Sequence, residues 1–528
     1  MSTAQKQPHL LLISGNLSLL RGHYEGVLSA LSAAGVRISI RYIKQKWLTV
    51  EEFTAMLQEA GVDADVRPLS RAPGDPDEFF GLRLRQLINV LRYLHADYSE
   101  RTALSSRAFA GSPAGVQRWA RRIRRLGRRP ALATMRCLAL LESMLPPSRA
   151  ALATLDEERP DAVVATPVIR TPELVDFLKA AAWRGIPKAT WIESWDNLTN
   201  KGLLHGDPDR VFVWNASQVR ELTRYHRVPP ERACVTGAQT FDHWFGDDPP
   251  SGRAEFCARL GIESDQPIIL YLASSGQIAP NETEFFGRWL KTVRSSGDPL
   301  LRAAAVLVRP HPTVVAAWLE ENFELEPGVG VSPSIRSDAL NSDAFRQEYR
   351  DELHHSTLAV GINTSGLIDA AIFGKPVCTV ELPELFDGQR GTVHFHHLAD
   401  VESGVLRTAP SLDEHVAMLS EFVRRDPYAR DERSTEFVRT FVRPHGLEVA
   451  PAQIFAEEML RLCQAPSRAS ASGGPRRFAR RLIGRLALVI GAPLEERPFE
   501  RLLTHAAAGT IVSLVRLRHS LRGARARR

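Results

Sequence analysis

The stretch STLAVGINTSGLIDAAIFGKPVCTV, Ser356–Val380, decides the fold class of this chain. Its first apolar run, at 358–362, predicts a buried strand, and the amphipathic pattern that begins after Asn-Thr-Ser-Gly predicts a helix. A Gly-Lys-Pro sequence ends that helix before a second apolar run. A strand, a helix and another strand in this order are typical of a parallel α/β sheet.

The same alternation of apolar strands and helical patterns recurs in two blocks of the chain. We therefore predict an α/β fold with two Rossmann-like domains, residues 1–247 and 248–463, joined at the Pro/Gly/Asp-rich stretch FGDDPPSGR. In the first domain a helix is expected at about 23–34. The predicted strands are 9–14, 36–43, 161–167, 187–193 and 209–215 in the first block, and 267–275, 304–312, 358–362 and 375–383 in the second.

Two segments do not fit this alternation. Residues from about 76 to 149 are helical in pattern and rich in arginine, which indicates an insertion in the first domain. Residues 464–528 begin with the linker APSRASASGGP and continue as a basic, helical C-terminal tail. Its apolar runs of about ten residues are too short to span a membrane but suit an anionic membrane surface. Alternatively, the tail helices pack on the domains or remain solvated.

Composition places the chain among ordinary soluble proteins, with 44% apolar and 24% charged residues. Much of the excess positive charge lies at Arg118–Arg129 and in the last fifty residues, so acidic or phosphorylated surfaces are the expected partners. We do not expect nucleic acid as a partner. The polar N-terminus predicts a cytoplasmic protein, peripheral to the inner face of the plasma membrane if the tail binds lipid. The five widely spaced cysteines predict reduced, mostly buried thiols.

The polar seam Asn363, Thr364, Ser365 and Gly366 lies where a parallel strand feeds a helix, the usual place for a ligand in such sheets. Backbone N–H groups at a helix start can hold a diphosphate, and Asp369, one turn later, would accept a hydroxyl of a sugar or ribose. Ordinary helix capping by Thr or Ser is the alternative.

Two further loops of the second block carry residues compatible with phosphate. In LVRPHPT, a strand delivers Arg309 and His311 between prolines, as stabilisers of a leaving diphosphate. Ser274, Ser275 and Gly276 follow the first strand of the block and would let a ligand approach the backbone. A rigid surface turn and a plain strand-to-helix loop are the respective alternatives.

The first block offers candidates for handling an acceptor. His23, expected at a helix start, has the ordinary pKa of a general base, although a capping or surface histidine is the alternative. Glu193, at the end of the predicted strand at 187–193 and the start of the loop that follows it, is a second candidate for catalysis. This loop either binds the acceptor or forms an interface that is packed by two tryptophans. Its other polar and aromatic candidates are Trp191, Trp195, Asp196, Asn197 and Lys201.

The sequence GTVHFHHLAD contains candidate metal ligands. In an extended conformation His394 and His396 would share a face, but no nearby carboxylate or cysteine completes a set of ligands. We therefore predict no metal site.

The motifs RPHP, at 309–312, and NTSGLIDAAIFGKP, at 363–376, resemble the GT-B glycosyltransferase superfamily, in the branch near CDP-glycerol glycerophosphotransferases and capsular-polysaccharide-type transferases. The resemblance implies two facing domains, the second binding a nucleotide-linked donor and the first an acceptor. It also implies that His311 contacts donor phosphate, Ser365 the diphosphate, and Asp369 the polyol or ribose.

One departure from that pattern favours a sugar donor over glycerol phosphate: Asn363 and Thr364 stand where the glycerophosphotransferases would have Asp-Tyr. UDP-N-acetylglucosamine 2-epimerases share the architecture, but their acidic catalytic residues are not recognisable in this sequence.

We therefore expect a metal-independent glycosyltransferase that moves a sugar from a nucleotide sugar to a cell-surface glycan or lipid-linked acceptor, without a bound cofactor. The expected catalytic residues are His23, His311 and Glu193. A CDP-glycerol-type glycerophosphotransferase and a non-catalytic binding protein on the same fold are the alternatives.

Overall fold

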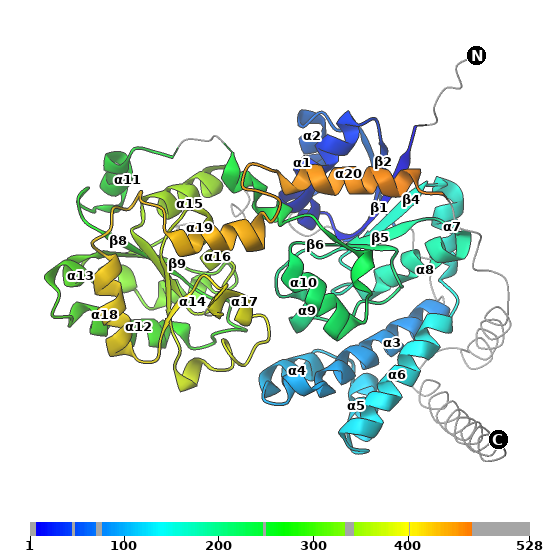
Figure 1. Ribbon diagram of the computed structural model, residues 1–528, viewed down its shortest axis with the longest axis horizontal. Coiled ribbons are helices and arrows are strands. Elements are labelled where there is room, and N and C mark those ends of the chain that lie inside the picture. Colours follow the sequence, from blue (N-terminus) through cyan, green and yellow to red (C-terminus); the bar gives the residue numbers. More distant parts are fainter. Residues whose placement is uncertain are drawn as a thin grey trace.

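The computed structural model describes residues 7–44, 48–69, 76–246, 250–332, 343–400 and 402–466, and shows two α/β domains side by side (Figure 1). The sheet of the first domain has seven parallel strands in the order β3-β2-β1-β4-β5-β6-β7. These strands are β1 (His9–Asn16), β2 (Arg37–Lys44), β3 (Ala64–Pro68), β4 (Ala162–Thr166), β5 (Lys188–Trp191), β6 (Arg210–Val213) and β7 (Ala233–Val235).

The second domain repeats this arrangement with six parallel strands in the order β10-β9-β8-β11-β12-β13. They are β8 (Ile268–Leu272), β9 (Ala305–Arg309), β10 (Val329–Val331), β11 (Leu358–Gly361), β12 (Val377–Val380) and β13 (Arg407–Ala409). In both sheets the strand order reverses beside the first strand of the domain, which opens a crevice at the carboxyl ends of the strands.

Helices cover both faces of each sheet, which explains why the central strands are continuous apolar runs. In β1, Leu10 and Leu12 join one core cluster, whereas Leu11 and Ile13 join another on the opposite face. The first domain contains α1 (Ser18–Ala33), α2 (Val50–Glu59), α8 (Val175–Arg184), α9 (Asn197–Asn200) and α10 (Ala216–Glu221). The second contains α11 (Arg253–Leu260), α12 (Glu282–Arg294), α13 (Pro299–Ala303), α14 (Val315–Glu320), α15 (Asp343–His355), α16 (Gly366–Ile372), α17 (His396–Ala399), α18 (Leu412–Phe422) and α19 (Glu432–Phe437).

The helical insertion expected at about 76–149 forms a separate bundle below the first sheet (Figure 1). Arg85 is buried at its centre and pairs with Glu142 at 2.8 Å and Asp176 at 2.9 Å, which ties the bundle to α8. The helices of the bundle are α3 (Pro76–Leu91), α4 (Thr102–Ala110), α5 (Ala114–Arg124) and α6 (Arg128–Met144), and the following α7 (Arg149–Glu158) packs on α8.

The last helix, α20 (Pro451–Gln464), crosses back from the second domain and lies along α1 (Figure 1). Phe455 and Met459 are buried in the core of the first domain. A boundary at 463 would assign this helix to the second domain. Its apolar face instead packs on the first domain, against α1.

The structure confirms the predicted α/β class with two Rossmann-like domains and differs in local detail. Helix α1 begins at Ser18, so His23 lies inside the helix and not at its start. The strands β3, β7, β10 and β13 were not predicted: β7, β10 and β13 have three residues each, and β3 has a weak apolar pattern, ADVRP. All five cysteines are free, as expected; Cys257, Cys378 and Cys463 are buried, whereas Cys137 is exposed.

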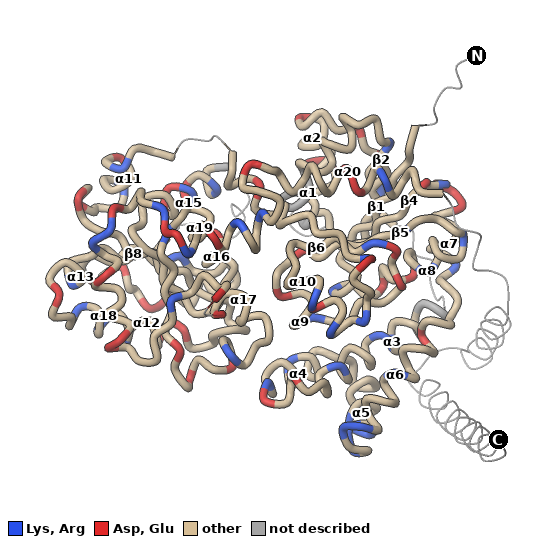
Figure 2. Tube along the Cα trace, in the orientation of Figure 1, with Lys and Arg blue, Asp and Glu red and all other residues tan. Residues whose placement is uncertain are grey.

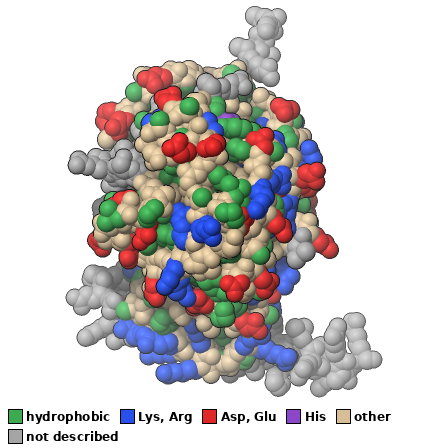
Figure 3. All heavy atoms as spheres, turned by 90° about the vertical axis from the view of Figure 1, so that its left-hand side faces the viewer, with side chains coloured by type: hydrophobic (Ala, Val, Ile, Leu, Met, Phe, Trp, Pro, Cys, Tyr) green, Lys and Arg blue, Asp and Glu red, His purple; other side chains and the backbone are tan. Residues whose placement is uncertain are grey.

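Charge is distributed unevenly over the two domains. Figure 2 shows lysine and arginine gathered on α5 of the insertion. Acidic, basic and apolar side chains are interspersed over the face of the second domain in Figure 3. In the described part of the chain, no helix is both long and apolar enough to cross a bilayer. Nearly all of the predicted basic tail, 467–528, lies outside the described residues.

A pocket between the two domains as candidate active site

A pocket of about 360 Å³ lies between the domains, at the carboxyl ends of β5, β8, β9 and β11. This is the edge at which ligands bind in open parallel sheets. The first domain contributes Arg107, Ser194, Trp195, Asp196, Asn200 and Lys201. The second domain contributes, among others, Ser275, Gln277, Arg309, His311, Phe345, Tyr349, Asn363, Thr364, Ser365, Gly366, Asp369 and His394.

Arg309, the last residue of β9, is the buried cation of the pocket. Its Nη1 donates to Glu352 Oε2 at 2.6 Å, and its guanidinium lies 4.0 Å from the ring centroid of Tyr349. Its Nη2 is buried and has no hydrogen-bond acceptor among the described residues. A buried guanidinium donor without an acceptor is costly, so this atom is available for a ligand oxygen.

His311 follows two residues after Arg309 and lines the same wall. The backbone N–H of Thr313 donates to its Nδ1 at 3.2 Å, so Nδ1 is the unprotonated nitrogen of the neutral ring and Nε2 carries the proton. Burial lowers the pKa of His311, which favours this neutral form at pH 7. The ring is thereby prepared to donate a hydrogen bond from Nε2.

Asp369 lies in α16 and is held by two donors, Trp244 Nε1 at 2.7 Å and the hydroxyl of Tyr349 at 2.9 Å. Burial raises its pKa to about 6, although both hydrogen bonds act to lower it. Each carboxylate oxygen keeps a free lone pair. The group can therefore accept a ligand hydroxyl and is mostly ionised above pH 6.

The seam at 363–366 divides into a structural and an exposed part. Asn363 is buried, and its Nδ2 donates to the carbonyl of Gly388 at 2.6 Å, which anchors the following loop. Thr364, Ser365 and Gly366 line the pocket, at the start of the seven-residue helix α16. Ser365 Oγ accepts a 3.0 Å hydrogen bond from Trp195 Nε1 of the other domain.

The loop after β8 is divided in the same way. Ser275 lines the pocket, but Ser274 is buried: its backbone N–H donates to Glu282, and its Oγ accepts from the backbone of Asn363 at 3.2 Å. Gly276 lies outside the pocket lining, and a Cβ at that position would come within 3.1 Å of Val314. Ser274 thus supports the strands beneath the pocket.

The first domain places a second charged group opposite this wall. Asp196 and Lys201 pair at 3.3 Å, and both line the pocket. Burial acts to raise the pKa of Asp196, but the Lys201 ammonium together with His394 and the hydrogen bonds from Ser194 and Asn200 lowers the pKa to about 2. Arg107, from α4 of the insertion, donates to the carbonyl of Gln277 at 2.8 Å and so connects the insertion to the second domain.

Of the other predicted catalytic residues, Glu193 is described and does not line the pocket. Glu193 is 4% exposed and accepts from Thr166 Oγ1 at 3.2 Å; burial raises its pKa to about 7. His23 lies in α1, and its side chain is outside the described part of the structure.

Sequence reasoning missed several residues of the site. Arg107, Tyr349 and His394 line the pocket, and Trp244 and Glu352 hold its charged groups. His394 belongs to GTVHFHHLAD, where the sequence suggests it only as a metal ligand, and the other four belong to no recognisable motif. A search for aromatic and acidic residues on helix faces could have suggested Tyr349 and Glu352, which lie three residues apart in α15.

No protein-family model matches the sequence, and no curated protein matches it. Similar solved structures include a Listeria monocytogenes protein described as a UDP-N-acetylglucosamine 2-epimerase, at 12% identity and a TM-score of 0.49, covering 88% of this chain and 98% of that one. The Neisseria meningitidis UDP-GlcNAc 2-epimerase bound to UDP-GlcNAc has 11% identity and a TM-score of 0.47 over 86% of this chain and 100% of that one. A Rickettsia africae glycosyltransferase has 10% identity and a TM-score of 0.46, covering 87% and 98%.

At these identities and TM-scores the comparisons indicate neither a substrate nor a reaction for this chain. Its own topology defines the class: two parallel Rossmann-like sheets, a helix that returns to the first domain, and a pocket between the domains. This is the GT-B arrangement expected from the sequence.

Proposed function

We propose that this protein is a glycosyltransferase that binds a nucleotide sugar in the pocket between its domains. The observation that carries the proposal is Arg309 Nη2, a buried donor on the pocket wall without an acceptor among the described residues. A phosphate oxygen is the acceptor that best matches a guanidinium donor in a buried setting.

The neighbours of Arg309 suit the rest of a nucleotide diphosphate. His311 offers an Nε2–H donor, and Thr364–Gly366 offer a polar backbone seam beside it. Because α16 has seven residues, we assign most of the stabilisation of a leaving diphosphate to Arg309 and His311 and little to the helix dipole. Asp369 would accept a hydroxyl of the ribose or sugar.

The first domain would then position the acceptor, a cell-surface glycan or a lipid-linked saccharide. Asp196 and Lys201 provide an acceptor and a donor for sugar hydroxyls, and Trp195 provides an apolar ring beside them. A carboxyl group with a pKa near 7 suits a general base at neutral pH, so we retain Glu193 for this role. That role requires the acceptor to extend past the pocket towards Thr166. His23 is retained as a second candidate base.

Calorimetric titration with UDP, GDP, CDP and their sugars tests the proposal. Binding of a nucleotide sugar, followed by release of a nucleoside diphosphate with an acceptor pool, is the expected result. Release of CMP from CDP-glycerol would indicate a glycerophosphotransferase, and binding without turnover a non-catalytic protein. If none of these nucleotides binds, the proposal is wrong.

A further inference from the structure

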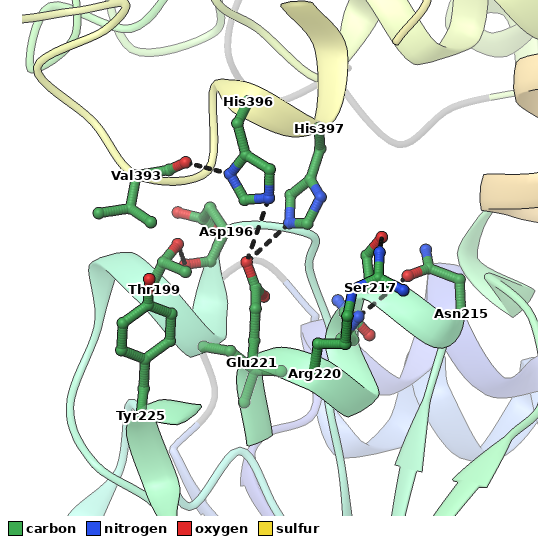
Figure 4. Close-up of polar contacts among 12 residues, drawn as sticks. Asp196, Thr199, Asn215, Ser217, Arg220, Glu221, Tyr225, Val393, His396 and His397 are labelled. Carbon is green, nitrogen blue, oxygen red and sulfur yellow. Dashed lines mark hydrogen bonds and ion pairs between the residues drawn. The ribbon is translucent and has the colours of Figure 1, made fainter. Parts of the chain in front are cut away.

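A second group of polar side chains lies at the domain interface, outside the pocket lining. Glu221 ends α10 of the first domain, and His396 and His397 begin α17 of the second. Figure 4 shows the Glu221 carboxylate directed towards both imidazole rings. One ligand atom from each of the three residues lies within 4.8 Å of the other two.

Glu221 and His397 are buried, and the atoms with which they face each other form no hydrogen bonds in the described part of the chain. Glu221 is 4% exposed, and neither of its carboxylate oxygens accepts a hydrogen bond within the described ranges. His397 Nε2 lies 2.9 Å from Glu221 Oε1, yet it too forms no hydrogen bond in that part of the chain. Burying a carboxylate in this state is costly unless a cation or a metal ion compensates.

The third side chain is oriented as a metal ligand would be. His396 Nδ1 contacts the carbonyl of Val393, which places the ring proton on Nδ1 and leaves Nε2 as the free lone pair. That Nε2 lies 4.0 Å from Glu221 Oε1, and the His396 side chain is 49% exposed, which provides a path for an ion from solvent.

The distances from Glu221 Oε1 to the two histidine nitrogens are close to what a tetrahedral ion requires. Metal–ligand bonds of about 2.1 Å at tetrahedral angles place neighbouring ligand atoms about 3.4 Å apart. The distances of 2.9 Å and 4.0 Å lie on either side of that value, so small side-chain rotations would suffice. Two imidazoles and one carboxylate suit Zn²⁺ and similar first-row ions better than Mg²⁺ or Ca²⁺.

We propose that Glu221, His396 and His397 form a site for a divalent ion of the Zn²⁺ class, which bridges the two domains. The ion would be bonded to α10 on one side and α17 on the other, with water in the remaining position. The ion would hold the two domains together, because Glu221 comes from the first domain and both histidines come from the second. The proposal is independent of the function assigned to the pocket.

Zn²⁺ titration of the chelator-stripped, full-length protein tests the bridge, with calorimetry to count bound ions. The wild-type chain should bind one equivalent that is weakened by about tenfold or more in both Glu221→Gln and His396→Ala, since even outer-shell changes have effects of this size. Both variants should fold, because His396 is half exposed and a neutral amide is less costly to bury than an unpaired carboxylate.

His445→Ala is the matched control, because this histidine is exposed and lies outside the cluster. The chain has 16 histidines, and any weak background binding to the others would be common to the wild type and every variant. Identical Zn²⁺ binding by wild type and His396→Ala would overturn the site. A loss in His396→Ala that Glu221→Gln does not share would overturn the bridge, since the ion would then be held by the second domain alone.

Discussion

The indole Nε1 of Trp195 donates a 3.0 Å hydrogen bond to Ser365 Oγ across the domain interface. Trp195 is 4% exposed and belongs to the loop after β5, whereas Ser365 immediately precedes α16. The bond therefore joins the acceptor side of the proposed active site to the seam proposed for the diphosphate. Its loss should lower the free energy of unfolding.

A double-mutant cycle measures this connection. Trp195→Phe removes the donor and Ser365→Ala the acceptor, and we expect a coupling energy of about 1 kcal/mol between them. Urea unfolding followed by circular dichroism is the measurement. If the two losses in unfolding free energy simply add, the hydrogen bond does not hold the domains together in solution.

Arg309→Lys separates ligand binding from folding at the pocket wall. The lysine keeps a cation opposite Glu352 but lacks the second guanidinium nitrogen, so nucleotide-sugar affinity should fall by about 1.5 to 3 kcal/mol with little change in stability. Calorimetric titration provides the measurement, with Arg288→Lys as the control because Arg288 forms an exposed ion pair away from the pocket. Unchanged affinity would remove Arg309 from the site.

Arg309→Ala is expected to behave differently from the lysine variant. Glu352 is 1% exposed and would be left as an unpaired buried charge, so the free energy of unfolding should fall by about 3 to 5 kcal/mol. Thermal unfolding of the alanine and lysine variants is the measurement. Equal unfolding midpoints would contradict a contribution of the Arg309–Glu352 ion pair to stability.

His311→Gln and His311→Ala test the tautomer assigned from Thr313. The glutamine amide places an N–H donor close to the position of the histidine Nε2, whereas alanine supplies none. We expect the alanine variant to lose about 1 kcal/mol of nucleotide-sugar binding and the glutamine variant to retain most of it. Equal losses in both would show that the ring acts in another way, for instance by accepting a proton.

Glu193 should make stability depend on pH. Its pKa is raised from 4.5 to about 7 by burial, so between these values the folded chain binds a proton more tightly than the unfolded chain. The stability that this group contributes is therefore complete below pH 4.5 and is lost as the pH rises through 7. Glu193→Gln cannot ionise, and at pH 8 it should exceed the wild type by on the order of 3 kcal/mol.

Urea unfolding of both proteins at pH 5 and pH 8 makes the comparison. The difference between variant and wild type should widen at the higher pH. If the wild type instead becomes more stable relative to the variant as the pH rises, a cation pairs with the Glu193 carboxylate and the pKa of this group is lowered by folding.

The basic tail predicts that the protein binds anionic membranes and that nucleotide binding by the two domains does not depend on the tail. Several arginines near an anionic surface each contribute about 1 kcal/mol, so the full-length protein should sediment with anionic vesicles and be released by high salt. Truncation after Gln464 keeps α20 intact and should abolish sedimentation without affecting nucleotide binding. Equal partitioning of both forms would exclude the tail as an anchor.

The strands that form the pocket were recognisable from sequence because their signal is local. Runs such as 268–272 and 358–361 are buried on both faces, so every residue in them is apolar or small, and the polar residues that follow mark the strand ends. The carboxyl ends of parallel strands meet at one edge, and the sequence therefore predicts that Arg309, His311 and Ser365 lie at the same site, as the pocket lining shows.

Contacts between distant segments were decided by the tertiary structure alone. No residue near Arg309 in the sequence indicates that its Nη1 donates to Glu352. Likewise, no residue near His396 indicates that Glu221 faces it from the other domain. The same is true of α20. Its apolar face predicts that the helix is packed against a core, but it does not specify which of the two domains provides that core. A sequence pattern records how much apolar or charged surface a segment must bury, whereas its partner is chosen by how whole domains pack.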